Sequence, residues 1–184
     1  SSRATPLTDG LAQEGLRRAA SGLRPAYHDG TDLAARTDMA LCSLLGGLAL
    51  ANAKLGAVHG FAAVIGGMAD AAHGAVCAAL LAAVVDVNVR ALREREPTHP
   101  ALDRYGDAAR ILTGRPGAMI EDGIDWIRET VATLNIPGLA ALGTRPEDAG
   151  EIVTKARTAS SMRFNPIPLT DTELHTILEL SMQP

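Results

Sequence analysis

Two histidines in the most apolar third of the chain are the residues whose type and spacing could support chemistry. His59 and His73 lie fourteen residues apart, and each is followed by a glycine, which lets the backbone approach closely. Burying an imidazole is costly unless both ring nitrogens find partners. Two such residues in one apolar segment raise the hypothesis of a shared metal ion, because neutral imidazole is a common metal ligand, but two ligands by themselves do not make a site. Hydrogen-bonded core histidines are the alternative.

The N-terminal part of the chain is predicted to form two helices. Thr5 can cap the first helix, which has a proline at its first position. Gly22 and Pro25 are expected to end that helix. A turn then leads into a long second helix, about Asp32–Lys54, which we expect Thr31 to cap.

The rest of the chain also reads as helical. A short helix is expected to carry His59, and the last helix has a capping box formed by Thr170 and Glu173. No β-branched alternation is long enough for a sheet. We therefore predict an all-α multi-helix bundle of seven to nine helices, a single domain over 1–184 centred on Met39–Val85. The other helices are expected at His73–Glu94, Ala101–Thr113, Ala118–Leu134, Pro146–Thr158 and Asp171–Met182.

The composition excludes several classes of protein. The net charge is −4 at pH 7, and the absence of a basic cluster argues against a nucleic-acid partner. Cys42 and Cys77 lie in apolar helical stretches and are interpreted as small core residues in a reducing compartment. The sequence has no signal-peptide pattern, so we expect a cytoplasmic protein.

Three uncharged runs of fifteen residues each require a check against membrane helices. A membrane span needs about 20 apolar residues, and these runs also lack aromatic belts at their ends. We expect them to be core helices of a soluble protein, with no membrane partner. The runs are Met39–Ala53, Leu55–Ala69 and Ala71–Val85.

The pattern around the two histidines is similar to that of a known family. It resembles the iron-containing (group III) alcohol dehydrogenases, which include the maleylacetate reductases, and the resemblance covers nearly the whole chain. The matching segments are Thr5-Pro6-Leu7-Thr8-Asp9, Ala51-Asn52-Ala53-Lys54-Leu55-Gly56, His59-Gly60-Phe61-Ala62, Gly66-Gly67, Ala72-His73-Gly74-Ala75-Val76-Cys77-Ala78, Asn88, Ala159-Ser160-Ser161-Met162 and Asn165-Pro166-Ile167-Pro168-Leu169-Thr170.

The resemblance implies a two-domain enzyme with an N-terminal α/β nicotinamide domain and a C-terminal helical metal domain. In the family an Asp and a His four residues apart hold the metal together with two later histidines, which His59 and His73 match. The Asp-x-x-x-His segment is expected just upstream of Ser1. No dinucleotide fingerprint follows a predicted strand, so no cofactor-binding residue is expected in this chain. Ala63 departs from the pattern, because many members carry another histidine there.

The implied function is the C-terminal metal- and substrate-binding domain of an NAD(P)-dependent, metal-dependent oxidoreductase. Fe or Zn would polarise the substrate oxygen, while Phe61 and Met68 would form an apolar pocket wall. The implied partners are a small alcohol, aldehyde or unsaturated acid and the N-terminal domain, and a homodimer is left open. We expect neither metal nor NAD or NADP to be firmly bound by this chain alone, and the isolated chain to be inactive. A helical assembly module and a metal-independent reductase are the alternatives.

The metal hypothesis makes a geometric prediction. The two imidazoles should face one cavity, with ligand nitrogens roughly 3–3.5 Å apart, because Zn and Fe bind imidazole at about 2.0–2.2 Å. Asp70 is the nearest carboxylate in sequence that could orient a ring.

Two other groups of polar residues are interpreted as structural. The carboxylates of Glu121, Asp122 and Asp125 complement a helix dipole, and Ser160-Ser161 has no base at a predictable distance.

Overall fold

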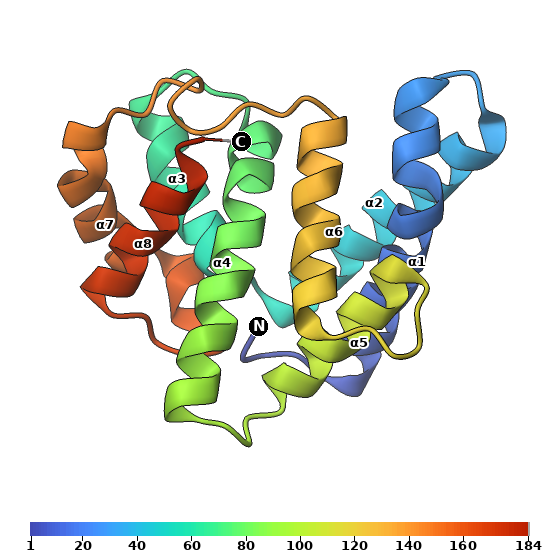
Figure 1. Ribbon diagram of the computed structural model, residues 1–184, viewed down its shortest axis with the longest axis horizontal. Coiled ribbons are helices and arrows are strands. Elements are labelled where there is room, and N and C mark those ends of the chain that lie inside the picture. Colours follow the sequence, from blue (N-terminus) through green and yellow to red (C-terminus); the bar gives the residue numbers. More distant parts are fainter. Residues whose placement is uncertain (184) are drawn as a thin grey trace. The chain divides into compact units, whose positions relative to one another are not determined.

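The computed structural model describes residues 1–183, which form eight α-helices, two short 3-10 helices and no strand (Figure 1). This confirms the all-α class and the expected number of helices. The elements are α1 (Pro6–His28), α2 (Leu33–Ala53), α3 (Ala57–Met68), α4 (His73–Arg95), α5 (Ala101–Thr113), α6 (Ile120–Thr133), η1 (Pro146–Asp148), α7 (Ala149–Thr158), η2 (Ser160–Phe164) and α8 (Asp171–Ser181).

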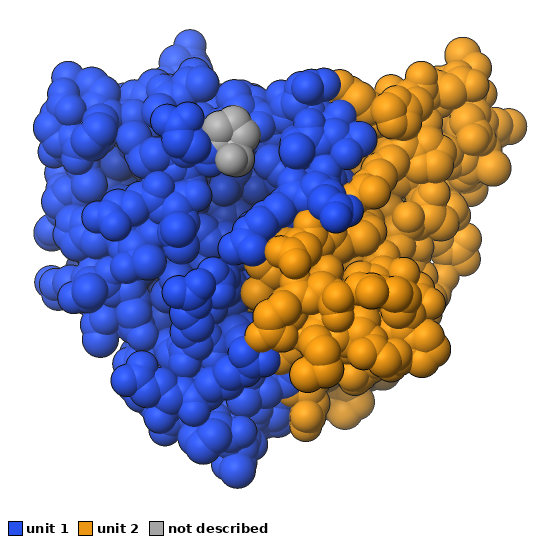
Figure 2. Space-filling view, viewed as in Figure 1, with its two compact units in different colours: residues 1–2, 55–102, 127–184 blue, residues 3–54, 103–126 orange. Residues whose placement is uncertain are grey.

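The chain forms two compact units, which are coloured separately in Figure 2. Unit 1 comprises residues 1–2, 55–102 and 127–184, and unit 2 comprises residues 3–54 and 103–126. Each unit has its own internal contacts and is described by itself. A single domain over 1–184 therefore stays a prediction.

Helix α1 is longer than the sequence indicated. Thr5 caps it as predicted, with its hydroxyl accepting from the Thr8 N–H. The prediction that Gly22 and Pro25 end the helix is wrong, because α1 continues to His28. Pro25 stands in the last turn, where its missing N–H removes a single helical hydrogen bond, and the N–H of Asp29 closes that turn on the Pro25 carbonyl at 2.8 Å.

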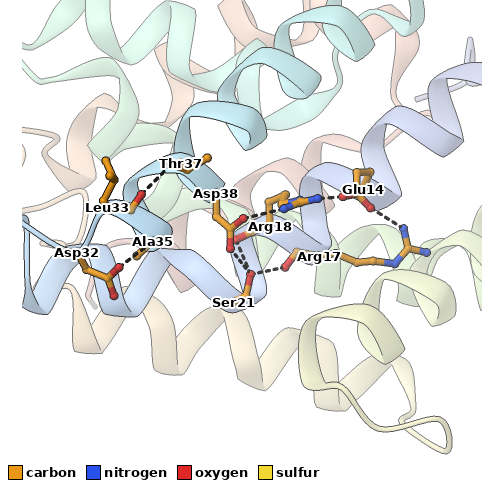
Figure 3. Close-up of polar contacts among 9 residues, drawn as sticks. All are labelled: Glu14, Arg17, Arg18, Ser21, Asp32, Leu33, Ala35, Thr37 and Asp38. Atoms are coloured by element: carbon orange, nitrogen blue, oxygen red, sulfur yellow. Dashed lines mark hydrogen bonds and ion pairs between the residues drawn. The ribbon is translucent and has the colours of Figure 1, made fainter.

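Within unit 2, α1 is held against α2 by a polar network, drawn in Figure 3, and by a close approach at Gly22. Arg18 donates to Glu14 at 2.7 Å and to Asp38 at 2.9 Å, and the Ser21 hydroxyl donates to the other Asp38 oxygen at 2.9 Å. Arg18 and Ser21 together lower the pKa of Asp38 below its usual value. At Gly22 an added Cβ would lie 2.7 Å from the Cβ of Asp38, so only glycine allows this crossing.

The start of α2 also differs from the prediction. Its N-cap is Asp32, whose carboxylate accepts from the Ala35 N–H at 3.0 Å, whereas Thr31 donates to Asp29 at 2.6 Å. The predicted Thr31 cap is therefore wrong. In an Asx turn the side chain of Asp29 already bonds two groups of Thr31, the N–H and the hydroxyl, which leaves Asp32 to cap the helix.

Helix α2 is not the core helix that its apolar composition suggested. Ala35 and Ala53 are its only buried residues, whereas Leu33 is 78% and Leu44 59% exposed within the described chain. By length and composition alone, α2 and α4 could each cross a membrane, with 6% and 50% of the relevant window buried. The expected centre at Met39–Val85 is therefore wrong for its α2 portion, because hydropathy does not report which face of a helix other residues cover.

The core of unit 1 is one apolar cluster contributed mainly by α3, α4, α7 and α8. Arg95 at the end of α4 pairs with Glu173 at the start of α8 at 2.9 Å. Glu173 also completes the predicted capping box with Thr170, which is confirmed. The fully buried large side chains of the cluster are Phe61, Ile65, Val76, Leu80, Leu139, Ile152, Leu174 and Ile177.

The helices between residues 146 and 164 differ from the predictions. The predicted helix Pro146–Thr158 consists of the 3-10 helix η1 followed by α7. Arg145 and Asp148 form the capping interaction there, with the Arg145 side chain donating to Asp148 at 2.8 Å. The 3-10 helix η2 was not predicted at all, since five residues give no periodic signal.

Candidate metal centre

The two histidines of the sequence motif lie next to each other in unit 1. His59 is the third residue of α3 and His73 is the first residue of α4. Helix α3 carries the chain about 14 Å from His59 to Met68 at 1.5 Å per residue, and the four-residue link 69–72 returns it. The ring centroids are 5.4 Å apart with an interplanar angle of 54°. The two rings therefore lie side by side, while the shared cavity and the nitrogen–nitrogen distance of 3–3.5 Å stay predictions.

A third side chain, which the sequence reasoning assigned to the core, joins this pair. Cys77 lies one helical turn after His73, and its Sγ is 3.4 Å from Nε2 of His73. One nitrogen of each histidine and the Cys77 sulfur all lie within 4.8 Å of one another. The i, i+4 spacing of His73 and Cys77 was the available signal, because such residues share one face of a helix.

The protonation of the group follows from its surroundings. Burial, and secondarily the charge of His73, lowers the pKa of His59 below its usual value. Burial raises the pKa of the Cys77 thiol, so this sulfur carries its proton near neutral pH. His59 therefore presents a neutral imidazole with a free lone pair, which is the form that binds a cation.

A buried amide pair fixes the start of α3, two residues before His59. Asn165 donates to Oδ1 of Asn88 at 2.6 Å and to the Ile167 carbonyl at 2.8 Å. Its own Oδ1 accepts from the Ala57 N–H at 3.1 Å. Helix α3 has no cap from its own N-cap residue, so Asn165 satisfies a helical N–H that would otherwise lack a partner. Asn88 and Asn165 therefore position the first turn of α3.

Two glycines let the C-terminal segment approach this turn. An added Cβ on Gly56 would lie 3.0 Å from Oδ1 of Asn165, and one on Gly60 would lie 3.0 Å from Cε of Met162. Met162 belongs to η2, the segment that follows α7. The Ser-Ser-Met and Asn-Pro-Ile segments singled out in the sequence thus pack against the helix that carries His59.

The two predicted pocket residues, Phe61 and Met68, differ in their exposure to solvent. Phe61 is fully buried in the core of unit 1, whereas Met68 is 38% exposed. Met68 lines a hollow of about 200 Å³ together with Thr144 and Arg145, and neither His59 nor His73 lines it. A substrate-lining role for Phe61 and Met68 stays a prediction.

The remaining candidate residues are mostly exposed. Asp70 is exposed, and within residues 1–183 no hydrogen bond joins it to either histidine of the motif. Ala63, the position where many family members have a histidine, is exposed as well. Asp122 accepts from the Met119 N–H at 2.7 Å and also pairs with Arg115, which favours the helix-dipole interpretation of its acidic cluster.

Comparison with known proteins gives a consistent result over the whole chain. Residues 1–182 match the sequence model of the Fe-containing alcohol dehydrogenase family, C-terminal. The chain is 31% identical over 180 residues to alcohol dehydrogenase 4 of Saccharomyces cerevisiae (strain ATCC 204508 / S288c), covering 97% of this chain and 45% of that protein. It is 44% identical over 92 residues to 1,3-propanediol dehydrogenase of Klebsiella pneumoniae, covering 50% and 24% respectively. The chain spans less than half the length of these relatives.

Solved structures share the fold. A crystal structure of 1,3-propanediol oxidoreductase superimposes with a TM-score of 0.88 at 30% identity, over 97% of this chain and 46% of that one. Maleylacetate reductase from Rhizobium sp. strain MTP-10005 gives a TM-score of 0.77 at 23% identity over 98% and 47%, which is a likeness of fold alone. With the sequence match over residues 1–182, these findings establish that the chain belongs to the Fe-containing alcohol dehydrogenase family and corresponds to its C-terminal part.

Proposed function

We propose that this chain is the metal- and substrate-binding part of an NAD(P)-dependent, metal-dependent oxidoreductase of the alcohol dehydrogenase or maleylacetate reductase type. The observation that carries this proposal is the approach of the His59 and His73 rings to 5.4 Å from two different helices. The partner of the chain is then a nicotinamide-binding domain such as the resemblance implies. The substrate would be a small alcohol, an aldehyde or an unsaturated acid.

The donor chemistry of the two histidines suits a divalent cation. The lowered pKa of His59 keeps its imidazole neutral at physiological pH, so no proton has to be displaced from that ring. Both imidazoles lie in the first turn of their helices, where the backbone arrangement is fixed by Asn165 for α3. Two nitrogen donors on adjacent rigid turns fit two positions of a zinc or iron centre.

In the proposed reaction the metal and the nicotinamide have one set of roles, and the residues of this chain have another. When bound, the metal would supply Lewis-acid polarisation of the substrate oxygen, and the nicotinamide would accept or donate the hydride. His59 and His73 would hold the metal and so orient the substrate oxygen. Asn165 and Asn88 keep His59 in place. Ala63 carries no titratable group, so a proton from the alcohol has to leave through a group other than the side chain at this position.

The test uses the chain together with the nicotinamide-binding domain, as one polypeptide or co-expressed. We expect about one metal per active site and NAD(P)-dependent alcohol oxidation. His59→Ala and His73→Ala should each reduce metal content and turnover by at least about 100-fold, the upper end of the effect of losing a supporting residue. The matched control is His28→Ala, because His28 is an exposed histidine at the end of α1 in unit 2.

Two outcomes would contradict the proposal. Full turnover by metal-free protein, unaffected by chelators, would identify a metal-independent reductase in which the two histidines contact substrate. A complex of the two parts that binds neither metal nor NAD(P) would identify a helical assembly module. Metal analysis and cofactor titration on the same preparation separate these alternatives.

A further inference from the structure

We propose that a small hollow in unit 1 is a binding site for a small neutral polyol such as glycerol. The hollow has a volume of about 200 Å³ and is lined by residues from the end of α3, the loop before η1, η1 itself and α7. Neither His59 nor His73 lines it. The site needs no metal and no nicotinamide, so this inference goes beyond the proposed function and does not rest on it.

The fold itself forms the walls of the hollow. The loop before η1 is closed by a backbone bond from the Thr144 N–H to the Leu139 carbonyl at 3.0 Å. Gly143 has a φ of +92°, a conformation that residues with a side chain rarely adopt. Ile65 and Ile152, which also line the hollow, are fully buried in the core of unit 1. The hollow is therefore built on parts of the chain that are held in place.

The hydroxyl of Thr144 has an unused hydrogen-bonding capacity. Thr144 lines the hollow and is 6% exposed, and its Oγ1 has no hydrogen-bond partner among the described residues. Buried polar groups in native proteins nearly always have a partner, so such a hydroxyl needs an explanation. A ligand hydroxyl would be a suitable partner, because a hydroxyl both donates and accepts.

An ion pair that lines the hollow has one further donor and one further acceptor. Arg145 donates from Nε to Oδ2 of Asp148 at 3.0 Å and from Nη2 to Oδ1 at 2.8 Å. Within residues 1–183, Nη1 of Arg145 makes no hydrogen bond, since Oε1 of Glu147 lies 3.6 Å away. Oδ1 of Asp148 accepts only the bond from Arg145 there, and that bond lowers the pKa of the carboxyl, which stays ionised. An N–H of Arg145 and a lone pair of Asp148 are thus available to a ligand.

These groups favour a neutral molecule with more than one hydroxyl. Arg145 and Asp148 neutralise each other, so a charged ligand would lose its hydration without gaining an unpaired opposite charge. A single hydroxyl would leave part of the set unused, whereas the adjacent hydroxyls of glycerol can bond Thr144 and the ion pair together. Pockets for drug-sized ligands have volumes of about 300–1,000 Å³, so this smaller hollow fits a molecule of the size of glycerol.

The experiment is a titration of the metal-free, reduced 184-residue chain with glycerol. It follows the methyl NMR signals of four residues that line the hollow, Ile65, Met68, Thr144 and Ile152. We expect these signals to shift together, with a dissociation constant in the millimolar range. Acetate and methylammonium, which are charged, and 1-propanol, which has one hydroxyl, should each bind at least about 3-fold more weakly, because each lacks one or more of the hydrogen bonds.

Two substitutions at one position isolate the hydroxyl. Thr144→Val keeps the shape of the side chain and should weaken glycerol binding by about 3- to 10-fold, whereas Thr144→Ser keeps the hydroxyl and should bind within about twofold of wild type. The matched control is Thr154→Val on α7, because this exposed threonine already donates to the Gly150 carbonyl at 2.8 Å. It should leave binding unchanged, and circular dichroism checks that each variant is folded.

Three results would overturn the proposal. Equal glycerol affinity of wild type and Thr144→Val would show that the hydroxyl takes no part. Shifts confined to the ring signals of His59 and His73 would place glycerol at the candidate metal centre instead. No shift at molar glycerol would show that water alone fills the hollow. The proposed function is tested separately, by metal content and turnover together with the nicotinamide-binding domain, so the two can fail independently.

Discussion

The side-chain amides of Asn88 and Asn165 face each other across 77 residues of sequence, with Nδ2 of Asn165 2.6 Å from Oδ1 of Asn88. Both residues are buried. Through the bond from the Ala57 N–H to Asn165, this pair connects α4 and the C-terminal segment to the helix that carries His59. A buried amide pair with its partners in place is stabilising mainly because either partner left alone would be costly.

Replacing Asn165 by alanine is expected to lower the free energy of unfolding by about 3 kcal/mol, because the buried Asn88 amide would lose its bonds to Asn165 and the Ala57 N–H would lose its acceptor. Urea denaturation followed by circular dichroism measures the change. Asn52→Ala is the control: this exposed asparagine on α2 bonds only the Leu48 carbonyl one turn earlier. The control should change stability by less than about 0.5 kcal/mol. Equal effects of the two substitutions would show that the amide pair does not matter.

A second prediction concerns Thr144, which is 6% exposed and whose hydroxyl has no hydrogen-bond partner among the described residues. Thr144→Val removes this hydroxyl without changing the shape of the side chain, so we expect a gain of about 1 kcal/mol in stability. Thr8 offers the opposite case, since it is also buried but its hydroxyl donates to the Thr5 carbonyl at 3.0 Å. Thr8→Val should destabilise the protein by about 1–2 kcal/mol. Thermal unfolding of both variants measures whether their stability changes have opposite signs.

Two glycines of α1 should respond in opposite directions to alanine. At Gly22 the new Cβ would be 2.7 Å from Asp38 Cβ and 3.1 Å from the Ala35 carbonyl, so α1 and α2 would have to separate. Overpacking of this kind costs about 1–3 kcal/mol. At Gly10 no atom lies within 4 Å, and Gly10→Ala should stabilise by up to about 1 kcal/mol through helix propensity. Chemical denaturation of the two variants is the measurement, and a stabilised Gly22→Ala would refute the close crossing.

The lowered pKa of His59 makes a prediction about pH. Above pH 6.5 the imidazole is neutral in both the folded and the unfolded chain and contributes nothing. As the pH falls below 6.5, the unfolded chain takes up the proton first, so stability decreases until the pH reaches the folded-state pKa. NMR titration of metal-free protein should give a His59 midpoint below 6.5, with the signal assigned by its loss in His59→Gln. That variant should also lose this part of the pH dependence, and a midpoint above 6.5 would contradict the burial argument.

The sequence by itself determined the class of the fold and most of its helices, because the signals for these are local. The caps by Thr5 and by Thr170 with Glu173 are hydrogen bonds between residues three apart, and both are present as predicted. Helix α5 has the predicted bounds. His59 and His73 could also be singled out as candidates, since polar rings in an apolar segment need partners, and the structure brings their rings together.

Only the tertiary structure decided how the candidate site is assembled and which apolar helices are buried. Asn165 caps α3 from 108 residues away, and His59 of α3 meets His73 and Cys77 of α4 only because the two helices pack together. The exposure of α2 depends likewise on what that helix contacts. Periodicity and composition describe which faces of a helix are apolar, but the contacts that cover a face come from residues distant in the sequence.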